Sequence, residues 1–481
     1  MKSSYLIQLI FLAYNQIIQC QSKTVPNIED LKDYKYGPDQ FTLAVIGDSG
    51  TNIEAKQVMQ LSSFNALLHL GDFNYKCLPD KYFTDILDQN RSYQFMGVAG
   101  NHDSKSQCGE DIAKKFLTNI HYHMVSNQNK ETKCEFSESK YMWSCVYKNM
   151  RVIGLTSGIS GADPKEEQLK FLKTHLGGAK EDWKICSWHF YDKYYHTGKY
   201  QEYGNIVSGD KEGDESFYDY CKDQGAIIFS AHDHVYARTK VMSKFKEPVI
   251  DKYDSTTSED IVQIRKGATV SFLSGTGGYE IYIEQGEQRN YQHWQKKYAR
   301  GDNNENIKRF GGMFCKFNYG GNKRKASCQF LRINSNEKVF DKFYIYRNDD
   351  PGSISYKDID SNFENEKVKA YKIENNIQDD PVLENNETNP SNRIEDNELD
   401  DIEEEIAEEK DKSINDDDIE NISVSYNDNS IKNNHKNRSI SISKIFIGCG
   451  SFAIVALTIG SIIYTINKKK KKTTDDKKIE D

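Results

Sequence analysis

The stretch FTLAVIGDSG, residues 41–50, sets the pattern that decides the fold. A mostly apolar run is followed at once by glycine and aspartate, which is typical of a buried strand that ends in a turn. A helical pattern over residues 53–63 comes next, and a second apolar run at 66–70 again stops at Gly71 and Asp72. Strand, turn and helix in this repeating order predict an α/β domain.

The same arrangement returns further along the chain, and polar residues again follow the expected strands. Three more apolar runs occupy residues 94–98, 184–188 and 226–230. Between them, Asp163 and Pro164 favour the start of a helix that continues to residue 176. Loops at the carboxyl ends of strands form the usual binding edge of an α/β sheet. We therefore expect the polar residues after these strands to meet at one edge of the sheet.

Two long apolar segments predict how the chain is placed in a membrane. Residues 1–22 favour a secretory signal peptide, with a buried N-terminal helix as the alternative. Residues 445–466 carry no charge and no proline, and they are long enough to cross a bilayer. A run of lysines follows at 468–472, and such a cluster stays on the cytosolic side. We expect a single-pass type I membrane protein whose domain is extracellular or lumenal, with a short basic cytosolic tail at 467–481.

Cysteine usage agrees with an oxidising compartment. Eight cysteines lie between the two apolar segments, and an even number in a secretory chain favours disulfides. Pairing between neighbours, such as Cys134 with Cys145 and Cys315 with Cys328, is the simplest of many connectivities, and no zinc-site spacing occurs. Asn-X-Ser/Thr sequences that begin at residues 90, 386, 421 and 437 predict a glycoprotein.

The character of the sequence changes after residue 347. Residues 348–443 are rich in Asn, Asp, Glu, Lys and Ser without sustained periodicity, and the acidic residues concentrate between 395 and 420. Such a segment buries too little apolar surface to offset chain entropy, so we predict a disordered acidic stalk. An acidic binding segment is the alternative. Residues 34–347 show no concentrated basic face, which argues against nucleic acid as the main partner.

Taken singly, the polar residues after the strands also allow ordinary structural roles. An aspartate after a strand, such as Asp48 or Asp72, can simply cap a turn. His189 stands among aromatic neighbours, which suits a satisfied core histidine. His232 and His234 form a more specific pattern, because a spacing of two places both imidazoles on one side of an extended chain. A site for one metal ion would already account for that pair.

Taken together, these residues predict a metal site. Two carboxylates, a phenol, an amide and three imidazoles follow the expected strands: Asp48, Asp72, Tyr75, Asn101, His189, His232 and His234. Mixed nitrogen and oxygen ligands suit iron, zinc or manganese. Hydrolysis of a phosphate ester by two metal ions needs such ligands, because the ions activate water near neutral pH and hold the phosphoryl oxygens. The sequence therefore predicts a two-metal phosphoesterase site.

The sequence resembles the calcineurin-like metallophosphoesterases. Five blocks match that family in order: Gly47-Asp48-Ser49-Gly50, Gly71-Asp72-Phe73-Asn74-Tyr75, Gly100-Asn101-His102-Asp103, His189, and Ala231-His232-Asp233-His234. Tyr75, three residues after Asp72, is similar to the purple acid phosphatase branch, nearest to its small tartrate-resistant type. The resemblance spans about residues 41–347. It implies an α/β fold for the domain at 34–347, a metallophosphoesterase β-sandwich flanked by helices (αββα).

Carried over by position, the resemblance implies two ions that share one carboxylate. A ferric ion would be held by Asp48, Asp72, Tyr75 and His234. A divalent ion (iron, zinc or manganese) would be held by Asp72, Asn101, His189 and His232. The resemblance also implies that His102 binds the phosphate or protonates the leaving oxygen. The family has a further histidine nine or ten residues after the position of His189, and His196, seven residues on, is the nearest match. We therefore predict His196, with His102, as a catalytic residue.

Two functions fit these expectations. The first is a membrane-anchored acid phosphatase that hydrolyses phosphomonoesters. The alternative is a phosphatase-like membrane anchor, because a tethered domain with a short tail resembles the glideosome-associated anchors of parasitic protists. That resemblance implies little or no catalysis, a place at the inner membrane complex and a tail that binds myosin motor proteins. For the chain itself, the expected membrane is the plasma membrane, a membrane of the secretory pathway or the inner membrane complex. A phosphodiesterase is a third hypothesis, which differs in the shape of the pocket.

Overall fold

The structure is a computed structural model that describes residues 31, 33–126, 131–198, 207 and 214–377. The predicted signal peptide, membrane segment and cytosolic tail lie outside these residues, as does the stalk from residue 378. Among the residues that are described, no helix is long and apolar enough to cross a membrane. The described residues fall within a compact unit that ends at Leu383.

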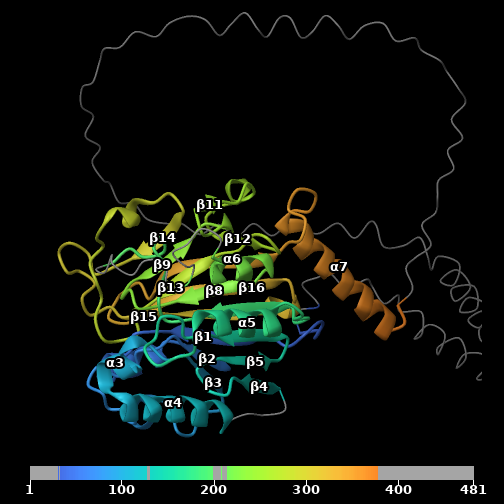
Figure 1. Ribbon diagram of the computed structural model, residues 1–481. Helices are drawn as coiled ribbons and strands as arrows, with labels where there is room; N and C mark the ends of the chain where they lie inside the picture. Colours follow the sequence, from blue (N-terminus) through green and yellow to red (C-terminus); the bar gives the residue numbers. More distant parts are fainter. Residues whose placement is uncertain (1–30, 32, 127–130, 199–206, 208–213, 378–481) are drawn as a thin grey trace, which may run out of the picture. The chain divides into compact units, whose positions relative to one another are not determined.

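Two mixed β-sheets form the centre of the fold (Figure 1). The seven-stranded sheet has the order β12 (Ile261–Ile264), β17 (Val339–Arg347), β16 (Lys325–Arg332), β15 (Gly311–Phe317), β1 (Phe41–Ile46), β2 (Ala66–His69) and β3 (Gln94–Gly97). The eight-stranded sheet has the order β14 (Trp294–Tyr298), β9 (Tyr236–Thr239), β13 (Ser271–Ser274), β8 (Ile227–Ser230), β7 (Trp183–Ser187), β6 (Met150–Gly154), β5 (Trp143–Tyr147) and β4 (Thr132–Phe136). The expected mixed α/β fold is therefore confirmed.

Parallel strands lie in the part of each sheet that leads to the predicted site. Strands β1, β2 and β3 run parallel in the seven-stranded sheet. Strands β6, β7, β8 and β13 run parallel in the eight-stranded sheet. Their apolar side chains share one buried cluster, which includes Val45, Leu67, Ile185 and Phe229. The indole of Trp143 joins the sheets directly, because its Nε1 donates to the backbone oxygen of Gly97 at 2.7 Å.

Helices cover the sheets, as expected for the αββα arrangement (Figure 1). Helix α5 (Lys165–Leu176) and helix α6 (Phe217–Asp223) pack on the eight-stranded sheet, where Leu172 and Phe217 share a buried cluster with Ile228. Helix α4 (Glu110–Val125) packs against β3, and helix α2 (Ile53–Met59) adds Val58 to the same core. The smaller elements are α3 (Lys105–Cys108), η2 (Tyr82–Ile86), η3 (Asn101–Asp103), η4 (Asp254–Thr256), η5 (Glu287–Asn290), η6 (Tyr319–Gly321), β10 (Met242–Lys244) and β11 (Val249–Ile250).

Among the residues that the structure describes, four disulfides join cysteines that are neighbours in the sequence. Two of them, Cys134–Cys145 and Cys315–Cys328, link directly opposite residues of antiparallel strands, and this confirms the expected neighbour pairing. The other two pairs are Cys77–Cys108 and Cys186–Cys221.

The expected disordered stalk needs correction at its start. Residues 356–374 form helix α7 (Tyr356–Glu374), which begins with a capping box between Ser355 and Asp358. Ile359 is buried against Tyr346, and the ring of Tyr371 meets that of Tyr34 at 5.1 Å. Anchoring contacts at both ends of the helix offset its polar composition, so the folded domain continues past residue 347.

Candidate metal centre

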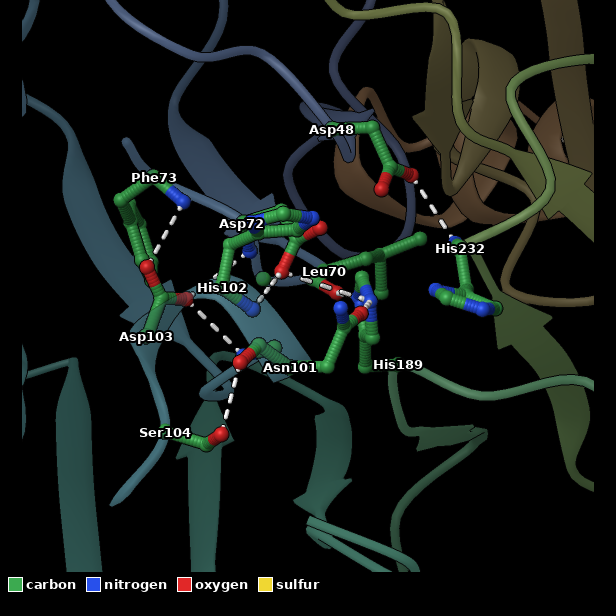
Figure 2. A network of polar contacts seen from close by, with 12 residues as sticks. Asp48, Leu70, Asp72, Phe73, Asn101, His102, Asp103, Ser104, His189 and His232 are labelled. Carbon is green, nitrogen blue, oxygen red and sulfur yellow. Dashed lines mark hydrogen bonds and ion pairs between the residues drawn. The ribbon is translucent and has the colours of Figure 1, made fainter. Parts of the chain in front are cut away.

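The predicted ligands meet where parallel strands of both sheets end. Asp48 follows β1, Asp72 and Tyr75 follow β2, and Asn101 begins η3 after β3. His189 follows β7, and His232 and His234 follow β8. We expected these residues to meet at one edge of a single sheet. That expectation is wrong, because the potential ligands come from two sheets. Figure 2 shows the carboxylates and the imidazoles facing one another across the join.

Two groups of potential ligands share one carboxylate. In the first group, side-chain atoms of Asp72, His189 and His232 all lie within 4.8 Å of one another. In the second, side-chain atoms of Asp48, Asp72 and His234 meet the same limit. All five side chains are buried. Asp72 is thus the side chain that can bridge two ions.

The hydrogen bonds of His189 favour a metal ligand at Nε2. Its Nδ1 lies 2.8 Å from the backbone oxygen of Leu70 and donates to it (Figure 2). That bond fixes the tautomer and leaves the Nε2 lone pair to face the side-chain oxygen of Asn101 at 2.9 Å and Asp72 Oδ1 at 3.5 Å. With Nε2 acting as a ligand, these three electron-pair donors would repel one another, and a cation between them would relieve that repulsion. The arrangement therefore fits a metal ion.

A second convergence of donors involves Tyr75. Its hydroxyl lies 3.3 Å from Asp48 Oδ1 and 3.1 Å from His234 Nε2. Burial disfavours the charged form of His234, but the nearby carboxylates of Asp48, Asp72 and Asp233 together outweigh burial and raise the pKa of the imidazole. The phenol, the carboxylate and the imidazole all come within hydrogen-bond or ion-pair distance of one another, so a cation could contact all three.

The hydrogen bonds of Asp72 provide an independent test of whether a metal ion suits this site. Its Oδ1 accepts a hydrogen bond from the backbone nitrogen of His102 at 2.9 Å. Its buried Oδ2 has no hydrogen-bond partner in the part of the chain that the structure describes. Burial raises the pKa of this carboxyl group, which means that the charged form lacks compensation. A cation beside Oδ2 would supply it.

The backbone is strained at three of the ligands. Asp48, Asp72 and His232 have φ values of 53°, 59° and 66°, in the left-handed region. Such conformations cost about 1–3 kcal/mol each and are held by surrounding structure. Here the Asp48 carboxylate accepts from the backbone nitrogen of His232 at 2.9 Å, which ties the β1 loop to the β8 loop. Strain at the ligand positions agrees with a functional site.

Asp103, to which the sequence assigned no role, holds the Asp72 turn in place. Its carboxylate accepts from the backbone nitrogens of Gly100 and Asp72 at 2.9 Å and of Phe73 at 3.1 Å (Figure 2). Its place beside His102 in a motif was the only signal of this role in the sequence.

His69 was also missed, because it lies inside an apolar strand. Its Nε2 lies 2.8 Å from the Ser49 hydroxyl and its Nδ1 accepts from the backbone nitrogen of Gly71 at 3.2 Å. Burial lowers the pKa of His69 to about 3, so the imidazole is neutral and can accept that bond. His69 thereby joins the loops that carry Asp48 and Asp72.

His102 lies at the rim of the centre. Its ring is half-buried, lies 4.3 Å from the ring of Tyr75, and has a pKa that burial lowers. The Cys77–Cys108 disulfide joins the two loops concerned, since Cys77 follows Tyr75 by two residues and Cys108 Sγ lies 3.2 Å from the backbone oxygen of His102.

His196 lies behind the centre. Its buried ring stacks on Tyr191 at 4.7 Å, and Tyr191 in turn lies 5.6 Å from the ring of His232. Neither ring nitrogen of His196 has a hydrogen-bond partner among the described residues, and burial lowers its pKa to about 4. The structure thus connects His196 to a ligand through an aromatic ring, and its catalytic role stays a prediction.

Comparison with known proteins gives a family match and several structural similarities. Residues 41–236 match the calcineurin-like phosphoesterase family. A purple acid phosphatase from yellow lupin (Lupinus luteus) is similar with 17% identity over 68% of this chain and 56% of that protein, at a TM-score of 0.48. The protein PhoD is similar with 9% identity over 71% of this chain and 78% of its own, at a TM-score of 0.35.

A 5'-nucleotidase precursor from Thermus thermophilus is also similar, with 15% identity over 70% of this chain and 59% of that protein, at a TM-score of 0.25. No curated protein matches the sequence.

Proposed function

We propose that this chain, which contains a calcineurin-like metallophosphoesterase domain, is a membrane-anchored acid phosphatase that hydrolyses phosphomonoesters. One observation carries the proposal: two buried groups of potential ligands share Asp72. Two metal ions bound there would polarise the phosphoryl oxygens and lower the pKa of a water molecule.

The chemistry of the donors supports different ions at the two positions. The phenol oxygen of Tyr75 and the carboxylate of Asp48, which lie beside His234, offer hard oxygen donors that suit a ferric ion. The neutral donors Asn101, His189 and His232 suit a divalent ion, which would be iron, zinc or manganese. Asp72 would bridge the two ions.

Residues at the rim would act on the substrate itself. The His102 ring lies beside Tyr75, at the half-buried margin of the ligand groups. From there it can hold the phosphate or give a proton to the leaving oxygen. The bond from its backbone nitrogen to Asp72 Oδ1 holds the backbone of His102 beside the Asp72 carboxylate.

The proposal includes attachment to a membrane through residues 445–466, with the domain in the extracellular or lumenal space. Four disulfides among the described residues support an oxidising compartment. The cytosolic tail, to which motor proteins would bind under the anchor hypothesis, lies outside the described residues.

A hydrolysis assay tests the proposal. The full-length chain in detergent, loaded with iron and zinc, is expected to hydrolyse p-nitrophenyl phosphate at acid pH and to lose activity with a chelator. Asp72→Asn should abolish turnover, whereas Asp111→Asn, at an exposed aspartate on α4, should not. Absence of metal-dependent turnover in a folded, metal-loaded sample would contradict the proposal and favour the anchor.

A further inference from the structure

An exposed tyrosine lies one ring away from the second ligand group. The rings of Tyr279 and Tyr75 are stacked, with centroids 3.5 Å apart and planes inclined by 8°. Tyr279 is nevertheless 41% exposed, while the hydroxyl of Tyr75 reaches Asp48 and His234. The inner face of Tyr279 thus covers a predicted metal ligand, and its remaining surface is open to solvent beside the centre.

The stack is held in place by the loops beneath it. The backbone nitrogen of Tyr279 donates to the backbone oxygen of Asp48 at 3.3 Å, and Asn52 Nδ2 donates to the backbone oxygen of Gly278 at 3.4 Å. At Gly50, whose φ is +56°, a side chain would press on both tyrosine rings at 3.3 Å. The position of the Tyr279 ring is therefore fixed by the same loop that carries Asp48.

A second tyrosine shows what a purely structural stack looks like here. Tyr282 lies flat on His234, with centroids 4.1 Å apart and planes inclined by 6°, and it is only 6% exposed. Packing against His234 thus explains the position and the burial of the Tyr282 ring. It accounts only for the inner face of Tyr279, because a large part of that side chain remains uncovered.

We propose that Tyr279 determines specificity by stacking on a planar, unsaturated leaving group of the phosphomonoester. The inference rests on the proposed function and narrows its substrate class to aryl and similar esters. Exposed rings stack on planar partners without requiring particular hydrogen bonds. An aromatic pair of this kind contributes roughly a 2- to 12-fold preference.

Kinetics on two substrates test the proposal. For the full-length, metal-loaded chain, Tyr279→Leu should lower kcat/KM for phenyl phosphate roughly 2- to 12-fold relative to that for glycerol 3-phosphate. Tyr279→Phe should retain the preference, because it keeps the ring. Tyr122→Leu, at an exposed tyrosine on α4, is the matched control and should change neither value. Equal losses on both substrates would show that Tyr279 merely supports Tyr75, and would overturn the proposal.

Binding measurements, which need no turnover, distinguish a failure of this inference from a failure of the proposed function. Calorimetry with phenylphosphonate and methylphosphonate should show tighter binding of the phenyl compound, and Tyr279→Leu should remove the difference. Metal content measured on each variant shows whether the centre is intact. If neither ester is hydrolysed, the proposed function fails, while the ratio of phosphonate affinities still decides the role of Tyr279. An unaltered chain with no preference for the phenyl compound would refute the inference.

Discussion

The substitution Gly100→Ala places a single methyl group against the Asp72 carboxylate. Gly100 has φ −100° and ψ −179°, extended values that alanine adopts freely, so any effect comes from the methyl group alone. That carbon would overlap Asp72 Oδ1 and lie 2.5 Å from the Asp72 backbone nitrogen and 2.9 Å from Asp72 Cγ. Rigid backbone and a buried carboxylate surround it, so no flexible side chain can move aside.

The size of the effect follows from these contacts. Restoring ordinary separations requires a displacement of about 1 Å between Gly100 and Asp72. Asp103 bonds to the backbone nitrogens of both residues, so a displacement weakens at least one of these bonds. Overpacking of this kind costs about 1–3 kcal/mol. A 1 Å misplacement of reacting groups can lower a rate about 100-fold.

The assay measures metal and fold separately. Gly100→Ala is expected to lower the metal content per chain and to lower kcat about 100-fold. Thermal melts followed by circular dichroism should show a cooperative transition at a reduced Tm. Gly178→Ala is the matched control, because Gly178 is exposed, has no left-handed backbone and has no atom near the added carbon. Full metal content and unaltered kcat in Gly100→Ala would refute the view that close approach of this glycine to Asp72 positions the bridge.

Three further outcomes are expected. Tyr75→Phe should abolish the visible ferric–phenolate absorption of the iron-loaded chain with the fold retained, and a persisting band would exclude Tyr75 as a ligand. Arg238→Ala should cost about 3–5 kcal/mol in chemical denaturation, because it removes the only cation bonded to buried Asp341 among the described residues (Arg238 Nε lies at 2.8 Å) and leaves that carboxylate with the hydroxyl of Tyr236. Burial lowers the pKa of His293 from 6.5 to about 4. Between these two pH values the imidazole is protonated in the unfolded chain but neutral in the folded one, so the free energy of unfolding should fall as the pH drops through this range. His293→Phe should flatten that dependence by on the order of 3 kcal/mol, and an unchanged pH slope in urea melts would contradict the assignment.

The sequence predicted the strands that lead to the site because their patterns are local. The apolar run at residues 41–46 and the glycine after it appear in the structure as β1 and its turn. Ligands such as Asp48 and His189 could be assigned for the same reason, since each directly follows a strand. The allocation of strands to two sheets could not be predicted, because pairing depends on contacts between distant segments such as β1 and β15.

Helix α7 and Tyr279 were missed for different reasons. The helix has a polar composition, and its stability comes from contacts such as Tyr34 with Tyr371, which lie far apart in the sequence. Tyr279 follows a glycine-rich turn, and nothing in that stretch indicates that the turn returns to Asp48. Local patterns thus identified the candidate ligands, which the structure brings together, better than they identified the surroundings of those residues.

The position of the centre between two sheets makes sheet packing part of the chemistry. His189 is oriented by the backbone oxygen of Leu70 on the opposite sheet, and the backbone of His232 is held by Asp48, also on the opposite sheet. Each potential ligand group therefore contains members of both sheets. A small slide of one sheet over the other would separate the donors of both groups at once. Side chains that lock the sheets together at a distance, such as Trp143 with its bond to Gly97, consequently act on the geometry of Asp72 and its neighbours without touching them.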